Sequence, residues 1–413
     1  MIRPRRPLLG LFVLFVAVSS GSCSSVSSSR EQAAAPGRHG MVSTAHPLAT
    51  EAGLSILQRG GNAFDAAVAI ASTLNVVEPM MSGMGGYGTI LVFDAQRSEV
   101  HYLDASGKIP RAVDADLYRP PTPGYEENRR NAKAVSTPGA ANAWEAMSER
   151  FGVLPWEDVL QPAIGHAENG FVVDERTARL IRHAYAGFPA HAQAIYGREG
   201  EPLGPGALLI QTDLADSLRQ VAEGGAAAFY RGPIAEAIAA AMERSGGFLA
   251  ARDLAEDRAE WWQPISISYR DHEVFTPSAP AGAFPMLVRL GLMGLEDNRA
   301  LGHNSLEYLH RFAEVTKHAY WTRLAYSGDP DVKPPPYAEL LSAGSLRRVN
   351  DSLDRERAQP FDTAGILEAS ESKNTTHFVV ADKQGNVVSA TVTLGNLFGS
   401  ACATGPGSRT GSG

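Results

Sequence analysis

The chain has 413 residues, of which 44% are hydrophobic and 20% are charged, an ordinary composition for a globular protein with a sizeable core. This composition argues against a disordered or repetitive protein. The formal net charge is -8 and the Lys and Arg residues are scattered, so we expect no nucleic-acid partner and no electrostatic binding to a membrane. No long Pro- or Ser-rich linker interrupts residues 41–398, which favours one large folded unit.

The N-terminus has the pattern of an export signal. Arginines at positions 3, 5 and 6 precede an apolar run, Leu8–Val18, and then four small residues. The run is short for a membrane-spanning helix. Cys23 follows as in a lipoprotein cleavage site, although Ser20 stands where such sites usually have Leu. We expect an exported protein that is periplasmic or anchored in the cell envelope through a lipid on Cys23.

Two further expectations concern the mature chain. Residues 24–40 are rich in Ser and Ala and are predicted to form a flexible tether. Cys402 is then the only cysteine left, so no intramolecular disulfide can form and the core must supply the stability.

The first third of the chain predicts a helical layer that leads into a sheet. A short strand, Met41–Thr44, precedes a helix from His46 to Arg59, which two glycines end. The next predicted helix, Ala63–Val76, is nearly all apolar and should be buried on most sides. A Gly-rich segment, Ser82–Gly88, then leads into two predicted strands, Thr89–Asp94 and Glu99–Leu103.

The middle of the chain is predicted to be rich in helices. One long helix is expected from Ser305 to Tyr326, and the polar stretch from Arg347 to Asn374 should be exposed. Five other segments also have helical spacing: Ala141–Phe151, Trp156–Asn169, Glu175–Tyr185, Thr212–Glu223 and Pro233–Arg244.

Two β-rich runs, Thr376–Asp382 and Val387–Leu394, predict a hairpin around Lys383–Gly385. A three-residue loop of this kind commonly closes with a glycine in the left-handed region. Counting outward along both antiparallel strands places Thr375 opposite Thr393. Opposed residues have Cβ atoms about 4.5–5.5 Å apart, so the two hydroxyls should lie within hydrogen-bonding reach.

Threonines suit any half-buried strand, so the pair alone does not indicate a function. Its context does, because NTTH at 374–377 and TVTL at 391–394 resemble the processing site and the following strand of γ-glutamyltransferases. The resemblance covers most of the chain through further motifs in the same order: MVSTAHPLA at 41–49, GGNAFDAA at 60–67, VEP at 77–79, SGMGG at 82–86, TPG at 137–139, FGVLPW at 151–156, PAI at 162–164, FYRG at 229–232 and GDP at 328–330.

This resemblance implies an α+β fold, a four-layer α-β-β-α sandwich of the N-terminal-nucleophile hydrolase type. It also implies self-cleavage between Asn374 and Thr375, with Thr375 as nucleophile and Thr393 orienting its hydroxyl. A hydroxyl is a weak nucleophile and needs a base. The α-amine that cleavage frees titrates at about 7.7 to 8.0 in model peptides and can serve as that base. The implied substrate is a γ-glutamyl or other amide resembling glutathione, and no cofactor or metal is required.

Two departures from the family pattern concern the substrate. Many relatives have an arginine that holds the α-carboxylate of the γ-glutamyl group, whereas this chain has Ser106 at that place. A hydroxyl cannot replace a bidentate guanidinium. Lys108 is a candidate substitute two residues further along. The asparagine often found two residues after the second threonine is Gly395 here, with Asn396 adjacent.

A third departure concerns the C-terminus. Small subunits of the family continue beyond the hairpin with a serine pair, an aspartate and a glycine pair that forms the oxyanion hole, and these have no counterpart here. We therefore expect a sandwich that is incomplete at the C-terminus and a chain that is poorly folded or inactive by itself. The expected regions are 1–23 (signal), 24–40 (tether), 41–374 (large subunit) and 375–413 (start of a truncated small subunit, bound to the large one after cleavage).

Other interpretations are weaker. His310, Glu314 and His318 would share one helix face, a spacing compatible with a metal site, but a polar helix face explains them as well. The Gly-rich segment lacks a following Lys-Ser or Lys-Thr and precedes a strand, which favours close backbone approach over phosphate binding. Three functional hypotheses stay open: the family enzyme, a non-catalytic remnant that binds ligands in the envelope, and an amidase of altered specificity.

Overall fold

The computed structural model describes residues 40–124, 128, 131–361 and 374–400, all of which belong to one unit of the chain, Arg38–Gly413. The predicted export signal, Cys23, tether residues 24–39, Cys402 and the tail 401–413 lie outside the described residues. Among the helices of the described part, none is long and apolar enough to cross a membrane.

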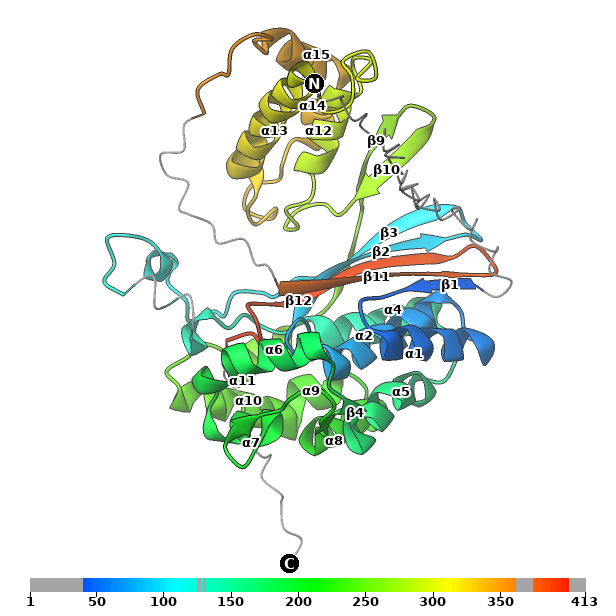
Figure 1. The fold of residues 1–413 in the computed structure, drawn as a ribbon, viewed down its shortest axis with the longest axis vertical. Coiled ribbons are helices and arrows are strands. Elements are labelled where there is room, and N and C mark those ends of the chain that lie inside the picture. The colour runs from blue at the N-terminus through cyan, green and yellow to red at the C-terminus, as the bar shows by residue number, and fades with distance from the viewer. Residues whose placement is uncertain (1–39, 125–127, 129–130, 362–373, 401–413) are drawn as a thin grey trace, which may run out of the picture. The chain divides into compact units, whose positions relative to one another are not determined.

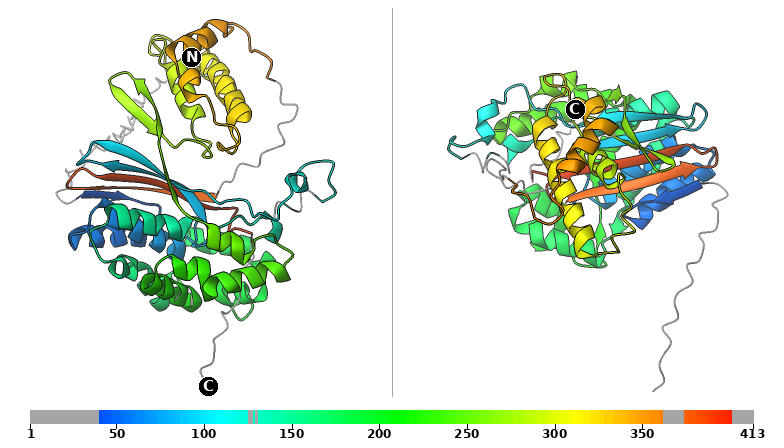
Figure 2. Two further views of the ribbon diagram at one scale, coloured as in Figure 1. Left: turned by 180° about the vertical axis from the view of Figure 1, so that it is seen from behind. Right: turned by 90° about the horizontal axis from the view of Figure 1, so that it is seen from above.

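The main sheet has six antiparallel strands in the order β1-β11-β12-β2-β3-β8 (Figure 1). The predicted hairpin forms β11 and β12, which run through the middle of the sheet between β1 and β2 (Figure 2). Among the described residues no other sheet exceeds two strands. The strands are β1 Gly40–Ser43, β2 Tyr87–Asp94, β3 Glu99–Ala105, β8 Glu260–Trp262, β11 Asn374–Asp382 and β12 Val387–Gly395.

The two faces of this sheet have different surroundings. On β11, Thr376, Phe378 and Val380 are buried, whereas Thr375 and His377 on the opposite face are exposed. Because side chains alternate along a strand, Thr375 and Thr376 must point to opposite faces. Helix α2 (Ala63–Val77) packs against the buried face at β11 and β12.

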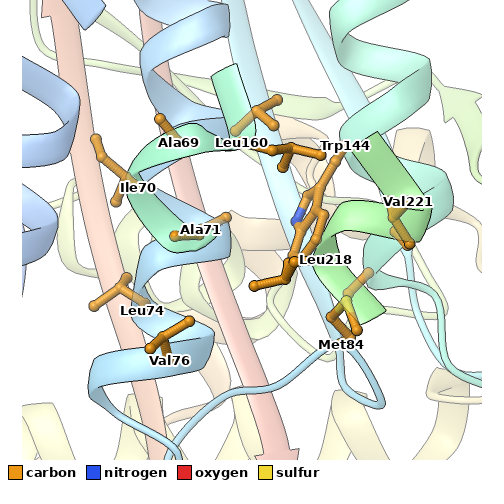
Figure 3. Packing of buried hydrophobic residues seen from close by; sticks show 14 of the residues in the cluster. Ala69, Ile70, Ala71, Leu74, Val76, Met84, Trp144, Leu160, Leu218 and Val221 are labelled. Carbon is orange, nitrogen blue, oxygen red and sulfur yellow. The ribbon is translucent and has the colours of Figure 1, made fainter. Parts of the chain in front are cut away.

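Helix α2 is buried along its whole length, as predicted from its apolar sequence. Asn62 caps it in a capping box with Asp65. The Asp65 carboxylate also accepts a hydrogen bond from Val153 N, which fixes the loop after α4. Beside α2, Trp144 is fully buried and lies among Leu160, Leu218, Val221 and Met84 (Figure 3).

The predicted helices of this layer are confirmed to within one residue at each end. Three helices of this layer were not predicted, because α7, α9 and α11 have only five to seven residues, too few to show helical periodicity. The layer comprises α1 Pro47–Gln58, α4 Ala140–Phe151, α5 Trp156–Asn169, α6 Glu175–Ala184, α7 Ala190–Tyr196, α8 Thr212–Gly224, α9 Ala227–Arg231, α10 Pro233–Arg244 and α11 Ala251–Glu256.

A second hydrophobic cluster joins helices α12 (Pro285–Met293), α13 (Leu306–Tyr326) and α15 (Ala343–Ser352). The expectation that residues from Arg347 onward are exposed holds for Arg347, Arg348 and most of the described positions that follow, but it was wrong for Asn350. Residues 347–352 belong to α15, where Asn350 is buried and its Oδ1 accepts a 2.8 Å hydrogen bond from Arg311.

The remaining elements are short. They are β4 Phe171–Val172, β5 Gly197–Arg198, β6 Glu201–Pro202, β7 Leu208–Leu209, β9 Ile265–Tyr269, β10 His272–Thr276, the 3₁₀ turns Ala115–Tyr118, Ala132–Ala134 and Tyr185–Gly187, and α14 Tyr337–Leu340.

Candidate active site

The hairpin turn has the predicted form. Gly385 has φ +91°, in the left-handed region that glycine adopts without strain. Its N–H donates to the Asp382 carbonyl at 3.2 Å, and the Asp382 carboxylate accepts the N–H groups of Gln384 and Asn386. The same carboxylate accepts the N–H of Ala63 at 3.0 Å, which ties the turn to the start of α2. The turn therefore sets the register of both strands.

The predicted register is confirmed, since Thr375 pairs with Thr393. The Thr375 hydroxyl donates to Thr393 Oγ1 at 3.2 Å, and the Thr393 hydroxyl donates to the carbonyl oxygen of Asn374 at 2.7 Å. Gly395 N–H also donates to Thr393 Oγ1, at 2.9 Å. One side chain thus contacts both the hydroxyl and the carbonyl of the Asn374–Thr375 peptide, the bond predicted to be cleaved.

A β-bulge lies directly beyond this pair. Asn374 pairs with Gly395 while Thr375 pairs with Thr393, so Leu394 has no partner on β11. The N–H of Leu394 instead donates to the carbonyl of Met81 at 3.1 Å. Bulges redirect side chains and are frequent next to active sites. This one ends the regular ladder at the predicted cleavage site.

The Gly-rich segment lies against the strand that carries Thr393. A Cβ on Gly86 would lie 2.6 Å from the Thr393 carbonyl oxygen, and a Cβ on Gly88 would lie 2.4 Å from that of Thr391. Real Cβ atoms do not approach oxygen so closely, so only glycine fits at both positions. The predicted close backbone approach of this segment is thus observed at Gly86 and Gly88, toward the strand that carries Thr393.

The Ser106 hydroxyl is bonded to a neighbouring carboxylate. It donates to Asp104 Oδ1 at 2.6 Å, and the same oxygen accepts the Tyr102 hydroxyl at 2.7 Å. Burial raises the pKa of Tyr102 well above its ordinary value. The place predicted to hold a substrate carboxylate therefore presents a buried acid and two hydroxyls.

Lys108, the candidate substitute cation, is paired elsewhere. Its Nζ lies 2.7 Å from Glu260 Oε1. This hydrogen bond holds the pKa of Glu260 below its ordinary value. Lys108 is thus committed to a carboxylate of β8.

The strand order also sets the distance between position 106 and Thr375. Ser106 follows Ala105 at the end of β3, and Thr375 lies on β11, three strands away. Three spacings of about 4.8 Å separate the two backbones by roughly 14 Å. A serine side chain cannot span that distance, so Ser106 does not contact Thr375.

A cavity of about 560 Å³ lies next to the bulge. Gly395 and Tyr87 line it on the side of the sheet, and most of its other lining residues are apolar. Among the described residues that line it, Asp213 is the only charged one, so these residues offer no cation to a substrate carboxylate.

The residues His310, Glu314 and His318, considered above as possible metal ligands, lie on helix α13, and two of them bond to other groups. His310 Nε2 lies 2.8 Å from the Asp354 carbonyl oxygen, and Glu314 forms an ion pair with Lys317. In the part of the chain that the structure describes, no cluster of three His, Cys, Asp or Glu side chains is arranged to hold a metal ion.

Sequence reasoning missed two contacts of the hairpin. His377 Nδ1 lies 2.9 Å from Thr391 Oγ1 on the exposed face. On the buried face the Thr376 hydroxyl donates to Glu78 Oε2 at 2.7 Å. The alternation of a strand could have placed Thr376 inward, but nothing in the local sequence indicated its partner.

Comparison with known proteins agrees with this geometry. The family model for gamma-glutamyltranspeptidase matches residues 49–407. An acylase ACY 1 proenzyme from a Pseudomonas strain is 39% identical over 391 residues, covering 91% of this chain and 69% of the relative. The glutathione hydrolase proenzyme of Escherichia coli is 33% identical over 376 residues, covering 89% and 65%. The chain thus spans about two thirds of these relatives' length.

Solved structures give the fold class. A Helicobacter pylori gamma-glutamyltranspeptidase has a TM-score of 0.73 at 30% identity, covering 79% of this chain and 97% of that one. A Bacillus halodurans cephalosporin acylase has a TM-score of 0.77 at 28% identity, covering 89% and 68%. The fold is therefore the α+β fold of the N-terminal-nucleophile hydrolases. More narrowly, the chain belongs to the γ-glutamyltranspeptidase family, whose members are enzymes.

Proposed function

We propose that this chain is an autoprocessing amide hydrolase or acyltransferase whose nucleophile is Thr375. The observation that carries the proposal is the hydrogen-bond chain from Thr375 Oγ1 through Thr393 Oγ1 to the carbonyl oxygen of Asn374. A donor at 2.7 Å polarises that carbonyl and stabilises the charge that develops on its oxygen during attack.

In self-cleavage, Thr375 Oγ1 attacks the Asn374 carbonyl carbon and its proton passes to the leaving nitrogen. The amide becomes an ester between Asn374 and the Thr375 side chain. Water then hydrolyses the ester, which leaves a carboxylate on Asn374 and a free α-amine on Thr375. That amine is the base for turnover: it takes the hydroxyl proton as Thr375 attacks substrate and returns it to the departing amine.

The acyl donor is less narrowly defined by the site. The presence of glutathione hydrolases among the relatives favours a γ-glutamyl amide as the acyl donor. The γ-glutamyl group would then be transferred to water or to an amino acid or peptide acceptor. An acylase acting on a different amide is favoured by the bond between Ser106 and Asp104 and by the ion pair between Lys108 and Glu260, because both leave position 106 without a free cation. The acylase proenzymes among the relatives, one of them 39% identical, support the same reading.

The groups proposed for processing, Thr375, Thr393 and the Asn374 carbonyl, all lie on the described hairpin. Cleavage is therefore the function to test first.

The test is the intact mass of the purified chain after incubation at neutral pH, beside Thr375→Ala. Thr391→Ala is a matched control, since it removes a hydroxyl from the same face of the sheet further from the bond. Two fragments that meet between Asn374 and Thr375, absent only in Thr375→Ala, are expected. Uncut wild-type chain would contradict the proposal, as would cleavage that persists in Thr375→Ala.

We further propose that the chain is exported and lipid-anchored through Cys23, on the sequence pattern of residues 1–23. In a bacterial expression host, the wild-type chain should incorporate labelled fatty acid and fractionate with membranes. Cys23→Ser should abolish both. If both forms are instead found unlabelled in the periplasm, the proposed export stands and the proposed lipid anchor is contradicted.

A further inference from the structure

Beneath the nucleophile lies a buried pair that the mechanism above does not use. Thr376 follows Thr375 in sequence and points to the opposite face of the sheet. Its hydroxyl donates to Glu78 Oε2 at 2.7 Å, and the two residues are only 3% and 2% exposed. A buried carboxylate is costly unless it is bonded, so this contact holds both partners in place.

Glu78 has a second side-chain partner and lies at a junction of the backbone. Its Oε1 is 3.3 Å from Arg176 Nη1, a half-exposed guanidinium at the start of α6. Its own carbonyl accepts the N–H groups of Met81 and Ser82 at 2.8 and 3.1 Å. The end of α2 and the loop that follows it are therefore fixed by one residue.

That loop holds the other strand of the hairpin. The Met81 carbonyl accepts the N–H of Leu394, the unpaired residue of the bulge, and the Met80 carbonyl accepts the N–H of Phe398, both at 3.1 Å. Glu78 thus holds β11 through its side chain and β12 through its carbonyl and Met81.

This double attachment lies next to the point where regular pairing between the two strands is interrupted. The bulge interrupts regular pairing between Asn374 and Thr375. Inside the hairpin, the hydrogen bond from Thr393 to the Asn374 carbonyl oxygen holds the Asn374–Thr375 peptide. From outside the hairpin, Glu78 bonds the side chain of Thr376, the residue that follows Thr375 on β11, and so limits movement of this end of the described strand.

We propose that Glu78 and Thr376 are positioning residues that align the Asn374–Thr375 peptide on Thr393 for self-cleavage. The inference rests on the proposed function of Thr375. Neither side chain contacts the reacting atoms, and both act through the backbone of β11 and β12.

Cleavage kinetics test the pair in the full chain. Thr376→Val keeps the shape and removes the hydroxyl, and we expect cleavage to slow roughly ten- to a hundredfold, because small misplacements of reacting groups have effects of that size. Thr376→Ser should restore most of the rate. Ser72→Ala is the matched control, since Ser72 is a fully buried hydroxyl of α2 that bonds within its own helix; its melting temperature shows what a buried hydroxyl is worth without positioning.

A mutant cycle tests that the two residues act through one bond. Glu78→Met alone and the double variant with Thr376→Val should cleave at similar rates, because removal of either partner already breaks the contact. If the factors by which the two single substitutions slow cleavage multiply in the double variant, the proposal is overturned.

Hydrogen exchange tests the same pair without cleavage. In the Thr375→Ala background, adding Thr376→Val should speed amide exchange in residues 374–377 and leave residues 378–382 unchanged. Uniform acceleration along β11, or none, would overturn the proposal. A wild-type chain that stays uncut would count against the proposed function of Thr375, whereas the exchange result decides the positioning role by itself.

Discussion

The hydroxyl of Thr393 donates a 2.7 Å hydrogen bond to the carbonyl oxygen of Asn374, the residue before the proposed nucleophile. This bond leads to the first prediction. Thr393→Val should slow self-cleavage by about a hundredfold or more, as loss of one oxyanion donor does elsewhere. Thr393→Ser keeps the hydroxyl and should cleave at a rate near that of the wild type. Intact mass over time measures both, and equal rates for the valine and serine variants would refute a polarising role.

The Gly-rich segment provides a paired prediction. Gly86→Ala would place a Cβ 2.6 Å from the Thr393 carbonyl oxygen, whereas a Cβ on Gly85 would meet no atom within 4 Å. Overpacking of this kind costs about 1–3 kcal/mol. Gly86→Ala should therefore lower the free energy of unfolding by that amount and slow cleavage, and Gly85→Ala should change neither. Denaturant unfolding checks the first effect; similar losses in both variants would mean that close approach is not the cause.

Position 106 should control the choice of acyl donor. Ser106→Arg places a guanidinium where the family resemblance implies recognition of a substrate carboxylate, and arginine is long enough to cover part of the roughly 14 Å set by three strand spacings. In any preparation with measurable turnover, we expect kcat/KM for a γ-glutamyl anilide to rise relative to that for a neutral acyl anilide. Ser106→Gln supplies length without charge. A gain with Gln equal to that with Arg would exclude charge recognition, and no gain with either would favour the acylase interpretation.

Asp257 should make stability depend on pH. Burial raises the pKa of Asp257 from 3.8 to about 6, against a hydrogen bond from Asn142 that lowers it. Between these values the folded state holds a proton that the unfolded state has lost, so stability decreases as pH rises through this window. Asp257→Asn removes the titration, and its melting temperature relative to wild type should therefore increase from pH 4 to pH 7. A difference in melting temperature between Asp257→Asn and wild type that stays constant from pH 4 to pH 7 would contradict this prediction.

The hairpin and its threonine register were predictable because the signals are local. A glycine at position 385, two alternating strands and a count of residues suffice to place Thr375 opposite Thr393. The bulge could have shifted this register, but it falls beyond the pair, where Leu394 bonds to the loop after α2. The predicted reaction roles of both threonines, and of Asn374, stay predictions.

The features that were not predicted depend on partners distant in sequence. Asn350 is buried and accepts a hydrogen bond from Arg311, which lies 39 positions earlier, and no local polarity pattern shows this contact. Glu78 and Thr376 likewise meet across 298 positions of the chain. The motif around Glu78 was noticed only as part of a family resemblance, without a contact to explain it. Ser106 was predicted to lie where relatives hold a substrate carboxylate, but its hydrogen bond to Asp104 became visible only in the structure.

The last two strands of the described chain occupy the middle of the main sheet, and this order has a consequence for biosynthesis. Among the described strands, β1 pairs only with β11, and β2 has β12 on one side and β3 on the other. While the polypeptide is still being made, β1 has no strand to join and the interior of the sheet stays open until the hairpin has been synthesised. Contacts of such long sequence separation form slowly. The bond proposed for cleavage lies on this hairpin, the last of the described strands of the sheet to be synthesised, so a cut at Asn374–Thr375 would mark a molecule whose sheet has already closed.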